Sequence, residues 1–254
     1  IDEMHEQLKK DPKAQMLYLV PDNVKYEAET MILKQFKDKN ENAKYSGMIR
    51  LQVFSFSRLA WYLLQNKEIY QKPQLTDSGL GMLVKRILQQ EEENLTIFRG
   101  ASQQTGFVER LVSLFSELRN GKIDPIDLFE LKDTAEQKDK EKNNDFARKM
   151  DDLSLLYSKY DEALKGKYVE REDLFQELIK YFEANRQRFK HTTVIIDHYE
   201  HFSAQEQELV LTLCKHTQNV QICLTLDRKA LTTANDLNNM FYRPAKTYQQ
   251  LVHE

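Results

Sequence analysis

The chain has 254 residues, of which 41% are hydrophobic, so it is long enough to bury a substantial core. Its 37 lysine and arginine residues face 40 aspartate and glutamate residues. The resulting net charge of −3 excludes an overall basic field for nucleic acid, although not a local basic groove. Two cysteines, Cys214 and Cys223, are too few for a disulfide framework and wrongly spaced for zinc, and no apolar stretch approaches the roughly 20 residues that span a bilayer. We therefore expect a cytoplasmic protein with buried thiols and no signal peptide.

The chain does not begin with methionine. Its first residues, IDEMHEQLKKDPKAQ, place Ile1, Met4 and Leu8 at helical spacing, which predicts the second half of an amphipathic helix. We therefore expect the sequence to be a fragment that lacks residues upstream.

Two strand–helix pairs are predicted before residue 70. The continuous apolar run MLYLV at 16–20 is typical of a buried parallel strand, and a polar loop and a helix from about Tyr26 to Phe36 follow it. In IRLQVFSFS, apolar and polar residues alternate, which indicates a second strand. This strand leads into a second helix at SRLAWYLLQ.

Helical periodicity dominates the middle of the chain. Four apolar stripes follow helical spacing. They consist of Leu80, Leu83, Val84, Ile87 and Leu88; Phe107, Leu111, Leu114, Phe115 and Leu118; Leu153, Leu156, Tyr157, Tyr160 and Leu164; and Leu174, Phe175, Leu178, Ile179 and Phe182. The charged tract KDTAEQKDKEKNND at 132–145 separates the second stripe from the third, and we expect it to be an exposed segment.

The α/β pattern returns near residue 192. The run TVIID at 193–197 predicts a buried strand, SAQE at 203–206 is a capping box in front of a helix, and VQICLTLD at 220–227 predicts another strand. Strand, helix and strand with short links are typical of a parallel α/β sheet. We therefore predict a discontinuous α/β core at 1–69 and 192–254, interrupted by an all-helical insertion at 70–191.

Asp197 ends a predicted buried strand, and Glu200 follows three residues later. In phosphate-binding α/β proteins an aspartate in this position holds Mg²⁺, and a nearby acid can orient the attacking water. A buried strand that simply stops at a polar loop also explains the pattern. The phosphate loop G-x-x-x-x-G-K-[ST] that a nucleotide site requires is absent from these residues. His198 and His201 match no standard zinc spacing, so neither a metal site nor a catalytic triad is predicted.

The segment FSFSR lies where a predicted strand meets a helix. Its serine hydroxyls, the helix N-terminus and Arg58 together have the chemistry to hold a phosphate, and Phe54 and Phe56 have the chemistry to stack on bases. The alternative is two core aromatic residues, an N-cap at Ser55 or Ser57, and a surface arginine. The local sequence favours this alternative.

Four segments occur in an order that resembles a known family. They are YLVPDNVKYEAE, SGMIRLQVFSFSRLAWYLLQ, DDLSLLYSKYDEAL and VIIDHYEHFSAQEQELVLTL. Together they are similar to the N-terminal part of the B subunit of the AddAB/RexAB ATP-dependent helicase/deoxyribonuclease of Gram-positive bacteria, over nearly the whole chain. The resemblance implies a RecA-like core of the P-loop NTPase type, as in superfamily 1 helicases, with an inserted helical subdomain.

The resemblance also implies partners and cofactors. The full B subunit is expected to pair with an A subunit that carries the motor, to process double-strand DNA ends for recombinational repair, and to help recognise a Chi-type sequence. ATP and Mg²⁺ are implied for the full-length protein, since some family members carry a phosphate loop just before a helix that matches residues 1–10. The nuclease domain and the iron–sulfur cysteines are expected beyond Glu254.

By position, the resemblance assigns site residues. The implied DNA-contacting residues are Pro21, Asp22, Asn23, Ser55, Phe56, Ser57 and Arg58. Asp197 matches the acidic helicase motif, but His198 stands where active helicases have glutamate, which argues against ATP hydrolysis. We therefore expect a DNA- and partner-binding module of a heterodimer, with no membrane contact and no activity by itself. Two alternatives stay open: an ATP-binding or ATP-hydrolysing domain once an upstream phosphate loop is restored, and a purely structural scaffold for the A subunit.

Overall fold

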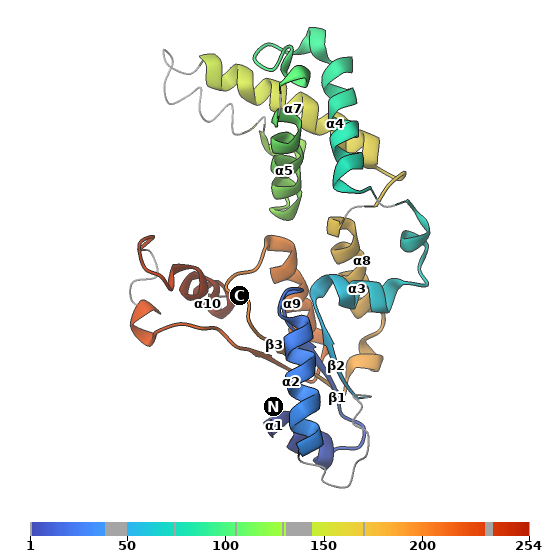
Figure 1. Ribbon diagram of the computed structural model, residues 1–254, viewed down its shortest axis with the longest axis vertical. Helices are drawn as coiled ribbons and strands as arrows, with labels where there is room; N and C mark the ends of the chain where they lie inside the picture. Colours follow the sequence, from blue (N-terminus) through green and yellow to red (C-terminus); the bar gives the residue numbers. More distant parts are fainter. Residues whose placement is uncertain are drawn as a thin grey trace. The chain divides into compact units, whose positions relative to one another are not determined.

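The structure is a computed structural model that describes residues 2–38, 50–73, 75–104, 106–128, 130, 144–169, 171–231 and 236–253 (Figure 1). The chain divides into two compact units. The sheet unit consists of Ile1–Gln65 and Phe175–Glu254, and the helical unit of Asn66–Leu174. The chain thus leaves the sheet unit once and returns to it within helix α8 (Arg171–Ala184).

Four parallel strands in the order β2-β1-β3-β4 form the sheet. The strands are β1 (Gln15–Leu19), β2 (Leu51–Phe54), β3 (Thr192–Ile196) and β4 (Asn219–Ile222). Every residue of β3 is buried, as expected for a strand that lies inside a parallel sheet. Leu19 aligns with Phe54 on one side and with Ile196 on the other, and Ile196 aligns with Ile222. The carboxyl ends of all four strands therefore lie at one edge.

Helices make up much of the rest of the sheet unit (Figure 1). They are α1 (Asp2–Lys10), α2 (Lys25–Asp38), α3 (Phe56–Leu64), α8, α9 (Ala204–His216) and α10 (Tyr242–His253), with the 3-10 turns η4 (Arg186–Phe189) and η5 (Arg228–Leu231). Apolar side chains of α1 and α2 pack against Met16, Tyr18 and Val20 on one face. The alternate residues Leu17 and Leu19 are buried as well, so both faces of β1 are covered.

These observations confirm the predicted parallel α/β sheet and its helices. The capping box is present as well, because Ser203 Oγ accepts a hydrogen bond from the Glu206 amide while the Glu206 carboxylate accepts one from the Ser203 amide. The last strand is shorter than the predicted 220–227. It ends at Ile222 because its partner β3 ends opposite, at Ile196, and offers no further ladder.

The expectation of buried thiols is wrong. Cys214 and Cys223 both lie at the surface. Cys223 directly follows β4, which pairs with β3 as its one neighbour among the described strands and is partly exposed. Cys214 lies on α9, outside the set of α9 residues that pack inward. An apolar neighbourhood in sequence did not reveal which side of each element faces the core.

The helical unit has one apolar core. The elements of this unit are α4 (Asp77–Gln90), α5 (Phe107–Asn120), α7 (Asn144–Leu164), the start of α8, and the 3-10 turns η1 (Glu68–Gln71), η2 (Glu92–Asn94) and η3 (Ala101–Gln103). The first three predicted apolar stripes lie on α4, α5 and α7 and supply most of this core. Of the predicted exposed tract at 132–145, residues 132–143 lie outside the described residues, and the last two begin α7.

The fourth predicted stripe lies on α8, most of which belongs to the sheet unit. The rings of Phe175 and Phe56 are 6.4 Å apart, and those of Phe182 and Phe189 are 4.5 Å apart. Residues 175–191 therefore group with the sheet, and the helical unit spans 66–174 where the expected insertion spanned 70–191. Helical periodicity shows that a face is buried but not which neighbour buries it.

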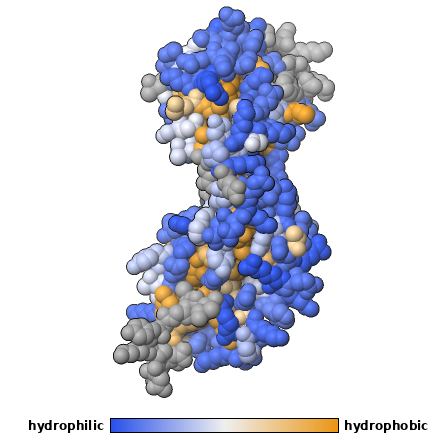
Figure 2. Space-filling model, turned by 90° about the vertical axis from the view of Figure 1, so that its right-hand side faces the viewer, coloured by the Kyte–Doolittle hydropathy of each residue, from blue (hydrophilic) through white to orange (hydrophobic). Residues whose placement is uncertain are grey.

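Among the described helices, none is long and apolar enough to cross a membrane. Figure 2 shows one face of the molecule, on which hydrophilic side chains predominate and apolar side chains form small patches.

Candidate functional site

The sheet has a topological switch point between β1 and β3. The chain leaves β1 through α2 to reach β2 on one side, and it leaves β3 through α9 to reach β4 on the other. Parallel α/β sheets bind ligands outside the carboxyl ends of the strands at such a point. The Asp197 amide donates to the Leu19 carbonyl at 2.9 Å, so Val20 and Asp197 leave the sheet side by side. This edge is the candidate functional site.

The Asp197 carboxylate is held by groups of the same chain. The Tyr18 hydroxyl donates a hydrogen bond to Oδ2 at 2.8 Å, and the His198 amide donates one to Oδ1 at 2.8 Å. His198 has a left-handed backbone, with φ of 65°, and its Nε2 lies 3.8 Å from Asp197 Oδ2. The Asp197 side chain keeps 31% of its surface exposed. The sequence pattern did not single out Tyr18, because a tyrosine inside a continuous apolar run resembles any core residue.

Burial and the neighbouring charge change the acidity of two groups at this site. Burial raises the pKa of Tyr18 far above its usual value, and the hydrogen bond to Asp197 adds to the rise. Partial desolvation raises the pKa of the Cys223 thiol, and the negative charge of Asp197 raises it further. Both groups are therefore protonated at neutral pH, and Tyr18 is a hydrogen-bond donor to Asp197 there.

The segment FSFSR forms the start of α3. Ser55 is the N-cap: its Oγ accepts a hydrogen bond from the Arg58 amide at 3.2 Å and donates one to Asp22 Oδ1 at 2.5 Å. Phe56 is only 1% exposed, and Ser57 Oγ is buried without a hydrogen-bond partner among the described residues. Of the four residues expected here to touch DNA, three therefore build the helix start, and the Arg58 side chain reaches solvent.

An exposed aromatic residue lies on the same helix. Trp61, the single tryptophan of the chain, is 48% exposed and lies three residues after Arg58, so the two side chains share one side of α3. The ring of Tyr62 packs 5.0 Å from that of Phe54 and is partly buried. The sequence pattern did not single out Trp61, because α3 is apolar on most sides and periodicity does not show which aromatic residue faces outward.

The loops after β1 and β3 contribute further polar groups to this edge. Asp22 and Asn23 are exposed, and Pro21 is partly exposed. In the second loop Glu200 is exposed, and its carbonyl accepts a hydrogen bond from Thr247 Oγ1 on α10 at 3.0 Å. Within the described part of the chain, no three His, Cys, Asp or Glu side chains gather as a metal site would require.

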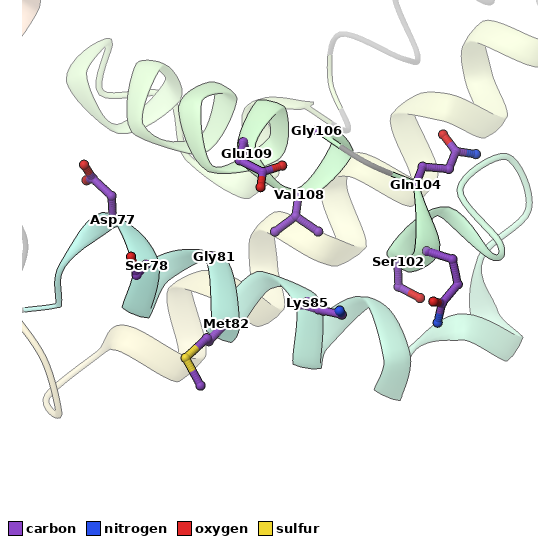
Figure 3. A pocket seen from close by; sticks show the side chains of 11 residues that line it. Asp77, Ser78, Gly81, Met82, Lys85, Ser102, Gln104, Gly106, Val108 and Glu109 are labelled. Atoms are coloured by element: carbon purple, nitrogen blue, oxygen red, sulfur yellow. The ribbon is translucent and has the colours of Figure 1, made fainter.

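A second candidate is a cavity of about 540 Å³ in the helical unit. Figure 3 shows Asp77, Ser78 and Lys85 on α4, Ser102 on η3 and Glu109 on α5 around it. The lining combines charges of both signs with polar and apolar side chains, and it contains no histidine or cysteine. No nucleophile–base pair can be assigned there, so the sheet edge is the stronger candidate.

A parallel α/β sheet with polar groups at its switch point belongs to the class of ligand-binding α/β folds. The family model described as ADDB, N-terminal, matches residues 1–254, and the chain therefore belongs to this family. The chain is 35% identical over 248 residues to the B subunit of the ATP-dependent helicase/deoxyribonuclease of Levilactobacillus brevis. This match covers 97% of the chain and 20% of the relative.

Two further relatives carry the same name. The protein of Enterococcus faecalis is 31% identical over 245 residues, or 96% of this chain and 20% of the relative. The protein of Bacillus mycoides is 32% identical over 259 aligned residues, or 99% of this chain and 21% of the relative. The chain thus spans about a fifth of the length of the relatives it matches.

Proposed function

We propose that this chain is the N-terminal helicase-like region of the B subunit of a cytoplasmic ATP-dependent helicase/deoxyribonuclease for double-strand break repair. Family membership supports this assignment. The parallel sheet, with an acid directly after β3, supports a RecA-like core. In this proposal the sheet edge binds single-stranded DNA and the chain has no catalytic residue of its own.

The observation that carries the DNA-binding role is the exposed strip of α3. Arg58 offers a cation for a phosphate, and Trp61 offers a ring on which a base can stack. Ser55, Phe56 and Ser57 then act by fixing the start of α3, and exposed Asn23 adds a side-chain donor for the backbone. Asp22 is tied to Ser55, so it shapes the loop rather than binding phosphate.

A partner protein is also part of the proposal. The relatives are named as B subunits, which supports an A subunit as the partner of the full protein. The helical unit is the candidate docking element, because its core is complete without the sheet. An iron–sulfur cluster and the nuclease belong, in this proposal, to the four-fifths of the relatives' length outside this chain.

A nucleotide site is the second candidate, because Asp197 lies where phosphate-binding α/β proteins hold Mg²⁺. Mg²⁺ demands octahedral oxygen ligands at about 2.0–2.1 Å and is bound by carboxylates together with phosphates. Asp197 accepts two hydrogen bonds and keeps about two acceptor sites, but the described residues supply no group of three ligands around it. The residues of this chain therefore do not fit Mg²⁺ by themselves, and DNA binding is the better supported function.

The test measures single-stranded DNA binding by the full-length protein between 50 and 200 mM salt, by fluorescence anisotropy. Arg58→Ala is expected to reduce the slope of log K against log salt by about 0.7, the contribution of one phosphate contact. Trp61→Ala is expected to weaken binding about tenfold, since one stacked base contributes roughly 1–3 kcal/mol.

Arg186→Ala is the matched control. Arg186 is exposed on η4, just before the amino end of β3, and thus lies at the opposite edge of the sheet. Equal salt slopes for Arg58→Ala and wild type, or equal losses for Arg58→Ala and Arg186→Ala, contradict DNA binding at the carboxyl edge.

A further inference from the structure

The acid at the switch point has an unexpected set of neighbours. Tyr18 comes from β1 and is 3% exposed, while Asp197 follows β3, so their hydrogen bond joins two strands across the switch point. A buried donor for Asp197 Oδ2 is already built into the sheet. The carboxylate therefore has a partner without any bound cation.

The loop that begins at Asp197 carries two aromatic residues back to α3. The ring of Tyr199 lies 5.1 Å from that of Phe56, and the ring of Phe202 lies 6.2 Å from it. The Tyr199 and Phe202 rings lie 5.5 Å from each other. Because Phe56 is the first residue of α3, these three rings connect the loop to the start of the helix.

We infer that Tyr18 and Asp197 are positioning residues: their hydrogen bond fixes the loop 197–203 and, through Tyr199 and Phe202, the start of α3. The carboxylate acts as a hydrogen-bond acceptor and not as a ligand of a divalent cation. The His198 amide, which donates to Asp197 Oδ1, is part of this arrangement, and the left-handed φ of His198 sets the direction of the chain that follows it. The consequence for DNA rests on the function proposed above, whereas the fixing of the loop does not.

Three variants distinguish the two possible roles of Asp197, hydrogen-bond acceptor and cation ligand. Asp197→Asn keeps a carbonyl oxygen for the Tyr18 hydroxyl but removes the charge that a cation requires. Asp197→Ala removes both, and Tyr18→Phe removes only the donor. Amide hydrogen exchange of the full-length protein measures how often the loop 197–203 and the first turn of α3 open. Tyr18→Phe and Asp197→Ala are expected to speed exchange there about tenfold, as expected for a hydrogen bond to a charged group.

Asp197→Asn keeps an acceptor for Tyr18 but loses the one for the His198 amide, so it is expected to speed this exchange less than Asp197→Ala does. If Tyr18→Phe speeds amide exchange equally in all four strands, the variant destabilises the whole sheet unit. This outcome overturns the positioning role. Mn²⁺ titration by electron paramagnetic resonance, with ATP present, tests the cation. The Mn²⁺ affinities of wild type and Asp197→Asn are expected to agree within twofold. A tenfold lower Mn²⁺ affinity of Asp197→Asn overturns the inference.

The same variants measure the consequence for DNA. Tyr18→Phe is expected to weaken single-stranded DNA binding while Asp197→Asn retains it, at a temperature where both are folded. If the exchange changes as expected but DNA binding does not, the positioning role stands and the proposed DNA-binding function is what fails. If the exchange does not change, the inference fails, whatever the result for Arg58→Ala.

Discussion

The two units each contain an aspartate that organises nearby backbone, and the two environments differ. In the helical unit Asp152 is 2% exposed and accepts hydrogen bonds from the amides of Thr96, Ile97 and Phe98 and from the Thr96 hydroxyl. In the sheet unit Asp197 accepts one hydroxyl and one amide and keeps part of its surface exposed.

The hydrogen-bond partners and the exposure of a carboxylate indicate its role in the structure. Asp152 has its acceptor capacity filled by the chain, so it stabilises the local backbone. Asp197 lies at an edge where ligands bind in this class of sheet, yet buried Tyr18 takes one oxygen. The hydrogen-bond partners of an acid at a ligand-binding edge therefore need to be considered before a metal site is assigned to it.

The largest effect is expected at Asp152. Asp152→Ala leaves three backbone amides without their acceptor and is expected to cost about 3–5 kcal/mol of unfolding free energy. Urea unfolding and the exchange rates of the amides at 96–98 measure it. Asp145→Ala on the same helix is the control, because Asp145 is 88% exposed at its side chain and should change stability by less than about 0.5 kcal/mol. If both variants lower the unfolding free energy equally, the special role of Asp152 is contradicted.

An intermediate effect is expected at Arg119, which joins three helices of the helical unit. Its guanidinium lies 3.0 Å from Asp161 and 2.9 Å from Asp173, and its side chain is 15% exposed. Arg119→Lys keeps the charge but not the planar fork and is expected to cost about 1–2 kcal/mol. Thermal unfolding at low and high salt measures this cost, with Arg110→Lys on the exposed side of α5 as the control. A loss no larger than that of the control shows that the fork is dispensable.

The smallest effect concerns alkaline pH in the sheet unit. Because the pKa of Tyr18 is raised in the folded state, the unfolded chain loses its proton first, above about pH 10. The contribution of Tyr18 to stability is thus complete below pH 10 and declines above it, by about 1 kcal/mol at pH 11. Unfolding curves from pH 8 to 11 should show a shallower decline for Tyr18→Phe. The Cys223 thiol also has a raised pKa, so its contribution to the decline is measured separately with Cys223→Ala. Parallel declines in wild type and Tyr18→Phe contradict the prediction.

Local patterns predicted the sheet well and the site only in part. The apolar run of β1, the run before Asp197 and the capping box at Ser203 carry their information within a few residues, and all three are present. The bond between Tyr18 and Asp197 joins residues 179 positions apart, and that between Ser55 and Asp22 joins residues 33 apart. Such pairs depend on strand order, which periodicity does not contain.

The unusual backbone of His198 also limits which residues can stand there. A left-handed φ of 65° is costly for most residues, tolerable for histidine, asparagine and aspartate, and free of strain for glycine. Valine or isoleucine at this position would force the chain to leave β3 along a different path. A saturation library at position 198 should therefore retain glycine and asparagine and lose the β-branched residues, whether or not the imidazole has any role of its own.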